Sequence, residues 1–445
     1  MEKTTELVIT GLGVVSSIGT GVEEFWNSLL QGKSGVGVSD YYTAQDVAQI
    51  NRLPYPMTAE VKTLETKRIK PRKNIKVMAR DIQLGFIAAD YARENSLLEQ
   101  TPVDPERQGI VFGALMIIVD VSELEPLYKG AIGEDGQFVP PLFGNEIGSM
   151  FPLWMLKYLP NMTPCHIAIA YDMRGPNNTL VIGEPGGLSA LVEASRVLRR
   201  GAADVMLAGG CASCTMPSAW FRYDLFQLSK HFDDPQKAYR PFDANRDGLV
   251  LGEGAAVCVL ETSESAKKRG APVYAKFLGY GEATEPVWHM QTDFAPAPEE
   301  VRVDRARFTG SSLKNAMRLA LDRAGLNPSD IAFVMASANG SVSGDLIEAQ
   351  AIADVLGSDV PVSSVKGATG YAMPASASME VVASALALKN RLLPHIATCE
   401  EKDPACPIDV VMNEPRPLGE DKKAAMILSC NFYGQATAVI IGRGE

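Results

Sequence analysis

Residues 180–198 read LVIGEPGGLSALVEASRVL, and this stretch decides the fold. The apolar run Leu180–Ile182 predicts a buried strand, and the glycines and proline of residues 183–187 predict an abrupt change of direction. Apolar and small side chains then recur at helical spacing, at Leu188, Leu191, Val192, Ser195 and Leu198. A strand, a glycine-rich corner and a helix N-terminus form the geometry that presents a nucleophile at the edge of a sheet.

The corner itself contains no serine, cysteine or threonine, and it offers Glu184 instead. Two interpretations of this residue stay open. The carboxylate can complement the positive end of the helix dipole, which is the interpretation that the local sequence favours. It can also take part in chemistry. The stretch therefore predicts the scaffold that presents a nucleophile, but not the nucleophile.

Length and composition set the class of protein. The chain has 445 residues, of which 46% are hydrophobic and 21% charged, which is typical of a soluble globular protein with two large halves. A net charge of −11 argues against nucleic acid or an anionic membrane surface as a partner. No apolar run reaches the roughly 18–20 residues of a membrane span, and the start shows no secretory signal. Seven cysteines without framework spacing indicate a reducing compartment, so we expect a cytoplasmic protein.

Three further motifs have plain interpretations. Cys211 and Cys214 resemble half of a metal or redox site, but no second pair follows, so we expect packed free thiols. Residues 243–248 imitate a calcium loop, but the closing acid Glu253 comes one position early and strand-like residues follow. We therefore expect no metal. The basic segment Lys62–Lys76 is interpreted as a solvated face or as a docking patch for an acidic protein.

Strands and helices alternate along the chain, and each half contains a strand, a glycine-rich corner and a buried helix of small residues. These units are residues 180–198 and residues 362–388. The alternation predicts parallel-rich sheets with helices on both faces. We therefore predict an α/β fold, a layered α-β-α-β-α sandwich of two similar halves, residues 1–262 and 263–445. The two corners are expected to face each other and form one shared site.

Four segments carry a resemblance to a known family. They are VITGLGVVSSIGTG from residue 8, RPFDANRDGLVLGEGAAVCVLE from residue 240, GDLIEAQAI from residue 344 and SSVKGATGY from residue 363. In this order they resemble the β-ketoacyl-acyl carrier protein synthases of the thiolase superfamily, the type II elongating condensing enzymes in particular. The likeness covers nearly the whole chain and implies the thiolase-like fold.

The resemblance also implies an active site of one cysteine and two histidines. The position of the cysteine is held by Glu184, that of the first histidine by Asn339 and that of the second by Tyr371. The family's lysine is kept as Lys366, and the gate residue matches Phe432. None of the chain's four histidines occupies a catalytic position. All three catalytic residue types are thus replaced on a retained scaffold.

Such a chain resembles the chain-length factors, the inactive partner subunits of type II polyketide and polyene synthases. The resemblance implies a non-catalytic subunit that pairs with an active ketosynthase, or with itself, during fatty-acid, polyketide or polyene elongation. It implies a substrate carried on the phosphopantetheine arm of an acyl carrier protein, with no cofactor of its own. The apolar segment before residue 162 then lies at the dimer interface and the end of the acyl tunnel, with Trp154, Leu156 and Tyr158 as the residues that limit chain length.

Three alternatives stay open at this stage. Glu184 can serve as a general base on an acyl thioester in an enzyme of altered chemistry. An active 3-oxoacyl-acyl carrier protein synthase would need Cys211 or Cys214 to relocate the site. An acyl-binding or scaffold homodimer would need no chemistry. Co-purification with a ketosynthase distinguishes the scaffold from the paired subunit, and thioester turnover identifies the enzymes.

Overall fold

The computed structural model describes residues 5–42, 57–223, 228–231, 233–286 and 308–444. Its described strands join in a large mixed sheet in the order β13-β11-β10-β15-β16-β9-β1-β8-β7-β5-β6. The first half of the chain supplies β1 (Leu7–Ser16), β5 (Gln108–Gly113), β6 (Asn177–Leu180), β7 (Val205–Ser213) and β8 (Glu253–Thr262). Since β6 is the last strand of the order, it forms one edge of the sheet.

The second half of the chain supplies the other strands. They are β9 (Ala275–Thr284), β10 (Ile331–Met335), β11 (Pro361–Ser363), β13 (Asp409–Val410), β15 (Ala424–Cys430) and β16 (Gln435–Arg443). The two halves are joined where the start of β1 pairs with the start of β9. Short strands outside this path are β2 (Gly19–Thr20), β3 (Val36–Val38), β4 (Met57–Ala59), β12 (Leu392–Leu393) and β14 (Arg416–Pro417).

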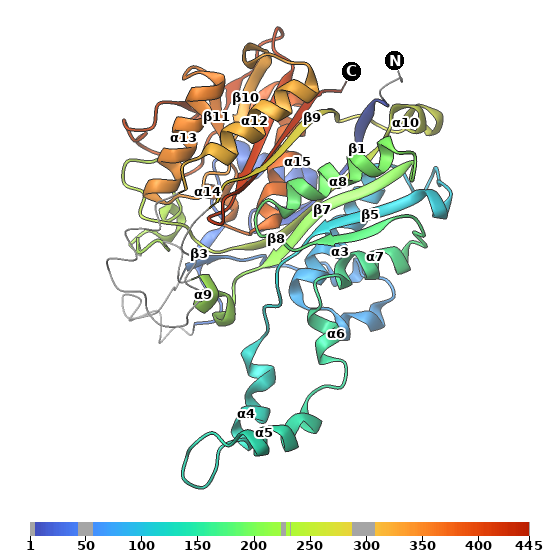
Figure 1. Cartoon of the computed structure of the whole chain (residues 1–445), viewed down its shortest axis with the longest axis vertical. Helices are drawn as coiled ribbons and strands as arrows, with labels where there is room; N and C mark the ends of the chain where they lie inside the picture. The colour runs from blue at the N-terminus through green and yellow to red at the C-terminus, as the bar shows by residue number, and fades with distance from the viewer. Residues whose placement is uncertain (1–4, 43–56, 224–227, 232, 287–307, 445) are drawn as a thin grey trace.

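Helices cover the sheet in layers, as Figure 1 shows. The outer layer of the first half contains α3 (Arg80–Asn95) and α7 (Met162–Ala170), and that of the second half contains α12 (Ser311–Ala324) and α13 (Val342–Leu356). Between the halves lie α8 (Gly186–Arg199) and α15 (Pro374–Asn390), which pack on each other and on strands of both halves. The predicted α-β-α-β-α sandwich is confirmed. Smaller helices include α1 (Val22–Leu30), α9 (Pro217–Tyr223), α10 (Ser263–Arg269) and α14 (Lys366–Thr369).

The central helices approach closely because their contact residues are small. A Cβ atom added to Gly187 of α8 would lie 2.2 Å from the carbonyl oxygen of Pro374, the first residue of α15. Every residue of α15 from Pro374 to Leu388 is buried. Glycine at position 187 is therefore required by the packing of α8 on α15. The small residues of the corner allow the N-terminal ends of these two helices to lie against each other.

The predicted strand Leu180–Ile182 is wrong in its bounds. The observed strand, β6, covers Asn177–Leu180 and is exposed at its first two residues. The side chain of Val181 is 40% exposed. The apolar run resembles a core strand in its composition. In the structure it follows the edge strand β6, and part of its apolar surface is exposed.

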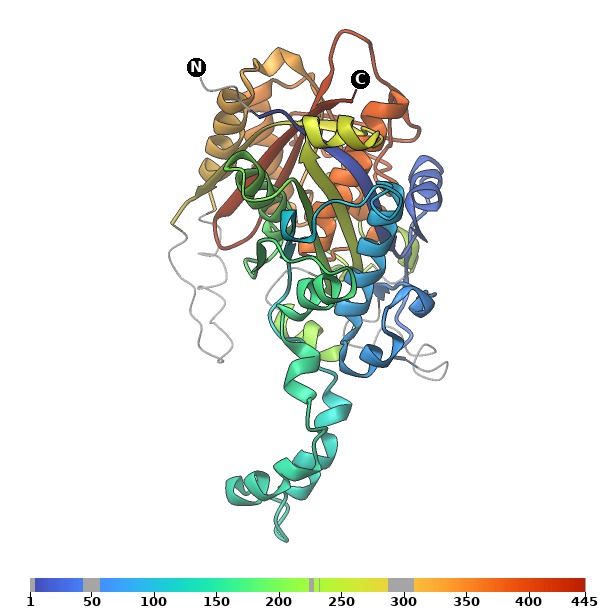
Figure 2. The ribbon, with the colours of Figure 1, turned by 90° about the vertical axis from the view of Figure 1, so that its right-hand side faces the viewer.

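A long arm leaves the first half between β5 and α7 and projects from the body in both views (Figures 1 and 2). We define the arm as residues 116–158. Its helices are η5 (Val121–Leu124), α4 (Glu125–Gly130), α5 (Pro140–Glu146), η6 (Ile147–Ser149) and α6 (Trp154–Tyr158). The helices α4 and α5 pack against each other and against η5 and η6, whereas α6 packs on α7 of the body.

Candidate functional site

The corner places Glu184 at the boundary between the two halves. Gly183 adopts a positive φ of 74°, which only glycine tolerates easily, and α8 begins two residues after Glu184. The side chain of Glu184 is completely buried. Its Oε1 atom lies 2.9 Å from Nζ of Lys366 and accepts a hydrogen bond of 2.9 Å from the hydroxyl of Ser337. Glu184 thus pairs with the second half of the molecule and does more than complement the dipole of α8.

Lys366 is the centre of this buried cluster. Its ammonium group contacts Glu184, lies 2.7 Å from Oε1 of Glu380 and donates to the backbone carbonyl of Ser337. Burial alone would lower the pKa of Lys366, but the carboxylates of Glu184 and Glu380 raise it above its ordinary value. Lys366 is therefore held as a cation, and the retained lysine is a structural counter-ion at the junction of the halves.

The cluster contains two acidic side chains, Glu184 and Glu380, and one basic side chain, Lys366. Burial raises the pKa of Glu380 well above its ordinary value, although Lys366 acts in the opposite direction. Oε2 of Glu380 is buried and makes no hydrogen bond. One ammonium group therefore faces two carboxyl groups, those of Glu184 and Glu380. Glu380 is not among the site residues predicted from the sequence. A lone acid within the small and apolar helix 375–388 was the available signal, since such an acid needs a buried cation.

Asn339, the position predicted for the first histidine, makes its side-chain hydrogen bonds at the start of α13. Ser337, two residues earlier, takes the place opposite Glu184. The chain turns at Ala338, which has a φ of 47°, and this turn directs Asn339 toward the start of α13. There its Oδ1 atom accepts hydrogen bonds from the backbone N–H and the hydroxyl of Ser341, at 2.9 and 2.7 Å. Ser337 follows closely on β10, and this position at a strand end was the missed signal.

Tyr371 lies at the same junction, where its phenol interacts with Glu184. Its side chain is buried, and burial followed by the charge of Glu184 raises the pKa of its phenol well above the ordinary value. Phe432 lies in the loop between β15 and β16, half-buried. The neighbouring Asn431 donates a hydrogen bond of 3.1 Å to the carbonyl of Ile182. The loop that carries Phe432 therefore touches the corner that carries Glu184.

No cysteine replaces the missing nucleophile. Cys211 and Cys214 are buried at the end of β7, and burial raises the pKa of Cys211 above its ordinary value. Cys430 lies beside the cluster, since its backbone N–H donates to the hydroxyl of Ser337 at 3.3 Å. Burial, followed by nearby carboxylates, raises the pKa of Cys430 well above its ordinary value. A thiolate, the nucleophilic form, is disfavoured at these buried positions.

The predicted tunnel residues lie at the base of the arm. Trp154 and Tyr158 pack with ring centroids 5.3 Å apart, and Leu156 is half-buried between them in the sequence. The hydroxyl of Tyr158 donates to Glu123 at 3.0 Å, which ties α6 to η5. Tyr158 also lines a cavity of about 340 Å³ with a mixed lining. Its apolar lining residues include Ile75, Met78, Leu115, Ile118 and Met216, and its charged ones are Lys76, Arg80, Asp81, Asp120, Glu123 and Lys157. Trp154 is not among the lining residues of this cavity, but its ring packs on that of Tyr158.

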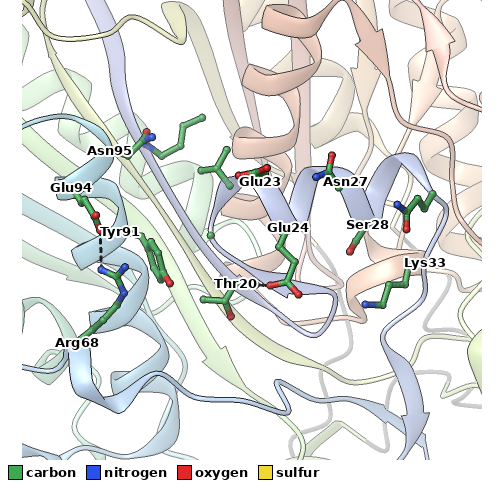
Figure 3. A pocket seen from close by; sticks show the side chains of 14 residues that line it. Thr20, Glu23, Glu24, Asn27, Ser28, Lys33, Arg68, Tyr91, Glu94 and Asn95 are labelled. Carbon is green, nitrogen blue, oxygen red and sulfur yellow. Dashed lines mark hydrogen bonds and ion pairs between the residues drawn. The ribbon is translucent and has the colours of Figure 1, made fainter.

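A larger groove of about 780 Å³ lies elsewhere, between α1 and α3 (Figure 3). Most of its lining residues are polar or charged, with Leu12, Val22 and Tyr91 among the others, and it contains none of the predicted site residues. The guanidinium group of Arg68 lies 3.7 Å from the centroid of the Tyr91 ring and pairs with Glu94. The groove is therefore separate from the cluster around Lys366.

The other motifs have structural roles. The carboxylate of Asp243 accepts hydrogen bonds from the backbone N–H groups of Asn245, Glu400 and Glu401, so it joins two loops. Within the ranges described above, no three His, Cys, Asp or Glu side chains are grouped so that they could hold a metal ion. Those ranges also contain no helix with the length and hydropathy needed to cross a membrane.

Comparisons with known proteins agree with this geometry. The family model of the β-ketoacyl synthase N-terminal domain matches residues 4–266, and that of the C-terminal domain matches residues 299–400. The 3-oxoacyl-[acyl-carrier-protein] synthase 2 of Coxiella burnetii is 32% identical over 447 residues, which cover 100% of this chain and 99% of that protein.

Two solved structures show the same fold over the whole chain. One is the ishigamide ketosynthase/chain length factor, with a TM-score of 0.82, 26% identity and full coverage of both chains. The other is AntDE:AntF, a type II polyketide synthase acyl-carrier protein in complex with its ketosynthase bound to the hexaketide, with a TM-score of 0.81, 27% identity and full coverage of both chains. On this agreement of family models, relatives and geometry, the chain belongs to the β-ketoacyl synthase family.

Proposed function

We propose that this chain is a non-catalytic subunit of the chain-length-factor type, which pairs with an active ketosynthase and shapes its acyl tunnel. The observation that carries the proposal is the identity and the pairing of residue 184, at the glycine-rich corner. The position that presents the nucleophile is held by Glu184, buried and paired with Lys366. The scaffold of the family is kept, but a buried ion pair stands where the nucleophile would be. This combination supports a binding role over a catalytic one.

The chemistry of the cluster is unsuited to condensation. Condensation needs a thiolate that carries the acyl chain and hydrogen-bond donors that stabilise an enolate. A carboxylate is a poor acyl acceptor and repels a developing enolate. The donors nearest to Glu184 are Ser337 and Lys366, and both are already engaged by its carboxylate. The chain therefore depends on a partner for catalysis.

The similar proteins support a ketosynthase as the partner. A ketosynthase/chain length factor pair and a ketosynthase with its acyl carrier protein both resemble this chain over its full length. The relatives named 3-oxoacyl-[acyl-carrier-protein] synthase 2 share the scaffold at about one third identity. We propose a heterodimer that acts on a chain held on the phosphopantetheine arm of an acyl carrier protein.

Reconstitution tests the proposal. An active ketosynthase, sought first in the neighbouring reading frame and produced with this chain, is expected to co-purify with it and to elongate acyl carrier protein substrates. The chain alone is expected to leave labelled acyl thioesters unchanged. If the chain alone turns over thioesters and Glu184→Gln abolishes this turnover, Glu184 is a general base and the proposal is wrong. If no ketosynthase co-purifies, the paired-subunit role fails.

We also propose that the cavity lined by Tyr158 receives the distal end of the acyl chain. Trp154→Ala is expected to lengthen the products of the reconstituted pair, since it removes the ring that supports Tyr158. Each added methylene gains about 0.8 kcal/mol when it is buried. Product lengths are measured by mass spectrometry.

Met155→Ala is the matched control, because Met155 is adjacent in α6 and exposed. It is expected to leave product length unchanged. Unchanged lengths for Trp154→Ala, Leu156→Ala and Tyr158→Ala, with an intact complex and normal turnover, would remove α6 from the tunnel.

A further inference from the structure

The cavity that Tyr158 lines contains a carboxylate without a cation. It belongs to Asp81, the second residue of α3, which is partly buried. Its Oδ1 atom accepts a hydrogen bond of 2.9 Å from the backbone N–H of the adjacent Ile82. Within the described ranges, no side chain donates a hydrogen bond to Asp81 and none forms an ion pair with it. The carboxylate therefore lies in the cavity without a side-chain partner.

The surroundings of Asp81 disfavour a carboxylate that has no donor. Burial raises the pKa of Asp81 to about 6, and the negative charge of Glu253 acts in the same direction. The neighbouring cation Arg80 is already engaged, since its Nε and Nη2 atoms donate to Glu253 at 2.7 and 2.6 Å. An acid in such surroundings lowers stability, and groups of this kind concentrate at sites that bind a ligand.

Other polar side chains around the cavity have partners within the chain. Ser213 donates a hydrogen bond of 2.8 Å to Glu253. Lys157 pairs with Glu123, which also accepts a hydrogen bond of 3.0 Å from Tyr158. Asp81 differs from these groups because its carboxylate, which can only accept, keeps acceptor capacity for a ligand.

The helix dipole does not account for the position of Asp81. A carboxylate in the first turn of α3 is stabilised by the dipole, but that effect needs no cavity. Glu23 occupies the first turn of α1 and is exposed to solvent. The dipole explains why an acid is tolerated at residue 81, whereas the contact with the cavity gives this acid access to a bound molecule.

The lining of the cavity indicates the chemistry of that molecule. Its apolar residues suit the methylene groups of an acyl chain, and Asp81 suits a hydrogen-bond donor at the end of the chain. A hydroxyl group is such a donor and is less costly to bury than an ammonium group. An ammonium group would also add a third positive charge to those of Arg80 and Lys157, which line the same cavity.

From these observations we infer that Asp81 makes the cavity selective for acyl chains whose distal end carries a hydroxyl group, over chains that end in a methyl group. The inference rests on the proposed function and names the substrate class of the proposed tunnel end. A methyl end would cover the carboxylate without donating to it. Sites built to bind a hydroxyl group reject the analogue that lacks it for this reason.

The test measures kcat/KM of the reconstituted pair with carrier proteins that bear ω-hydroxyacyl chains or acyl chains of equal length. The wild-type pair is expected to favour the hydroxyl-ended chain by at least about tenfold, and Asp81→Leu is expected to remove this preference. Asp81→Asn keeps the size of the side chain and one acceptor oxygen, so it is expected to keep only part of the preference.

Glu23→Leu is the matched control, because it removes an acid from the first turn of another helix, α1, away from the cavity. It is expected to keep the full preference. Melting temperatures identify any variant that fails to fold, and a reduced preference in a folded Asp81→Asn supports the inference without Asp81→Leu.

A second measurement does not depend on the ketosynthase. Calorimetry of the full chain alone is expected to show tighter binding of an ω-hydroxyacyl pantetheine than of the acyl pantetheine of equal length. Asp81→Leu is expected to abolish this difference.

The outcomes separate the inference from the proposed function. An active pair without the preference, or with an unchanged preference in folded Asp81→Leu, would overturn the inference and leave the proposed function intact. If no ketosynthase complex forms but the chain alone shows the Asp81-dependent difference, the proposed function fails and the assignment of the ligand stands. Equal binding of both probes together with no complex would overturn both.

Discussion

Lys366→Met is expected to lower the free energy of unfolding by about 3–5 kcal/mol, because it leaves buried carboxyl groups without their cation. Lys366 contacts Glu184 and Glu380, and all three side chains are fully buried. Methionine has a similar length and fills the space, so the loss measures the charge and its hydrogen bonds. Denaturant unfolding followed by circular dichroism gives the value.

Glu184→Gln is the matched control for this prediction. It removes one of two acids that share a single ammonium group, and Glu380 remains as the counter-ion at 2.7 Å. We expect a loss of no more than about 1 kcal/mol, since removing the surplus charge offsets the weakened hydrogen bonds. Equal losses for Lys366→Met and Glu184→Gln would show that the two groups act only as one pair, and the surplus-acid description would be wrong.

Glu184→Cys alone is expected to leave condensation at least about 10⁴-fold below that of an active ketosynthase. Catalytic groups act as a unit, so restoring one member recovers little. The residues that would have to assist the new thiol are Ser337 and Tyr371, and neither is a base at neutral pH. Lys366 and Glu380 would remain in place. The measurement is product formation from acyl and malonyl carrier proteins, with mass spectrometry of the intact protein for an acyl adduct.

A triple variant provides the comparison for Glu184→Cys. Glu184→Cys, Ser337→His and Tyr371→His together rebuild the family's residue types at the positions that the structure brings together. Asn339→His in place of Ser337→His is expected to contribute less, because Asn339 bonds to Ser341 whereas the hydroxyl of Ser337 contacts Glu184. Substantial activity from Glu184→Cys alone would contradict the account. So would a greater effect at Asn339 than at Ser337.

Much of the architecture followed from local patterns. The corner at 183–187 between an apolar run and an amphipathic helix predicted a nucleophile-presenting turn, and the structure has it. The replacement of the nucleophile by Glu184 and the retention of Lys366 could be stated from residue identity alone. The layered fold could be predicted too, because alternating strands and helices with small-residue helices leave few ways to bury their apolar faces.

Residue identity could not show which side chains meet across the two halves. The contact of Glu184 with Ser337 joins residues 153 positions apart, and after the turn at Ala338 the side chain of Asn339 bonds to Ser341 instead. The same holds for Glu380, which becomes a partner of Lys366 only because α15 packs against the corner. Local sequence determines periodicity and turns, whereas these pairings depend on how elements distant in the chain are packed.

The apolar segments show most clearly what the sequence determined and what the tertiary structure decided. The sequence by itself determined that Leu180–Ile182 and residues 151–162 are apolar, and hydropathy cannot distinguish a core from an interface. Only the tertiary structure decided that the first ends at the edge of a sheet and that the second lies at the base of a projecting arm. The physical reason is that burial is a property of the packed chain, and these surfaces lie where the chain's own packing ends.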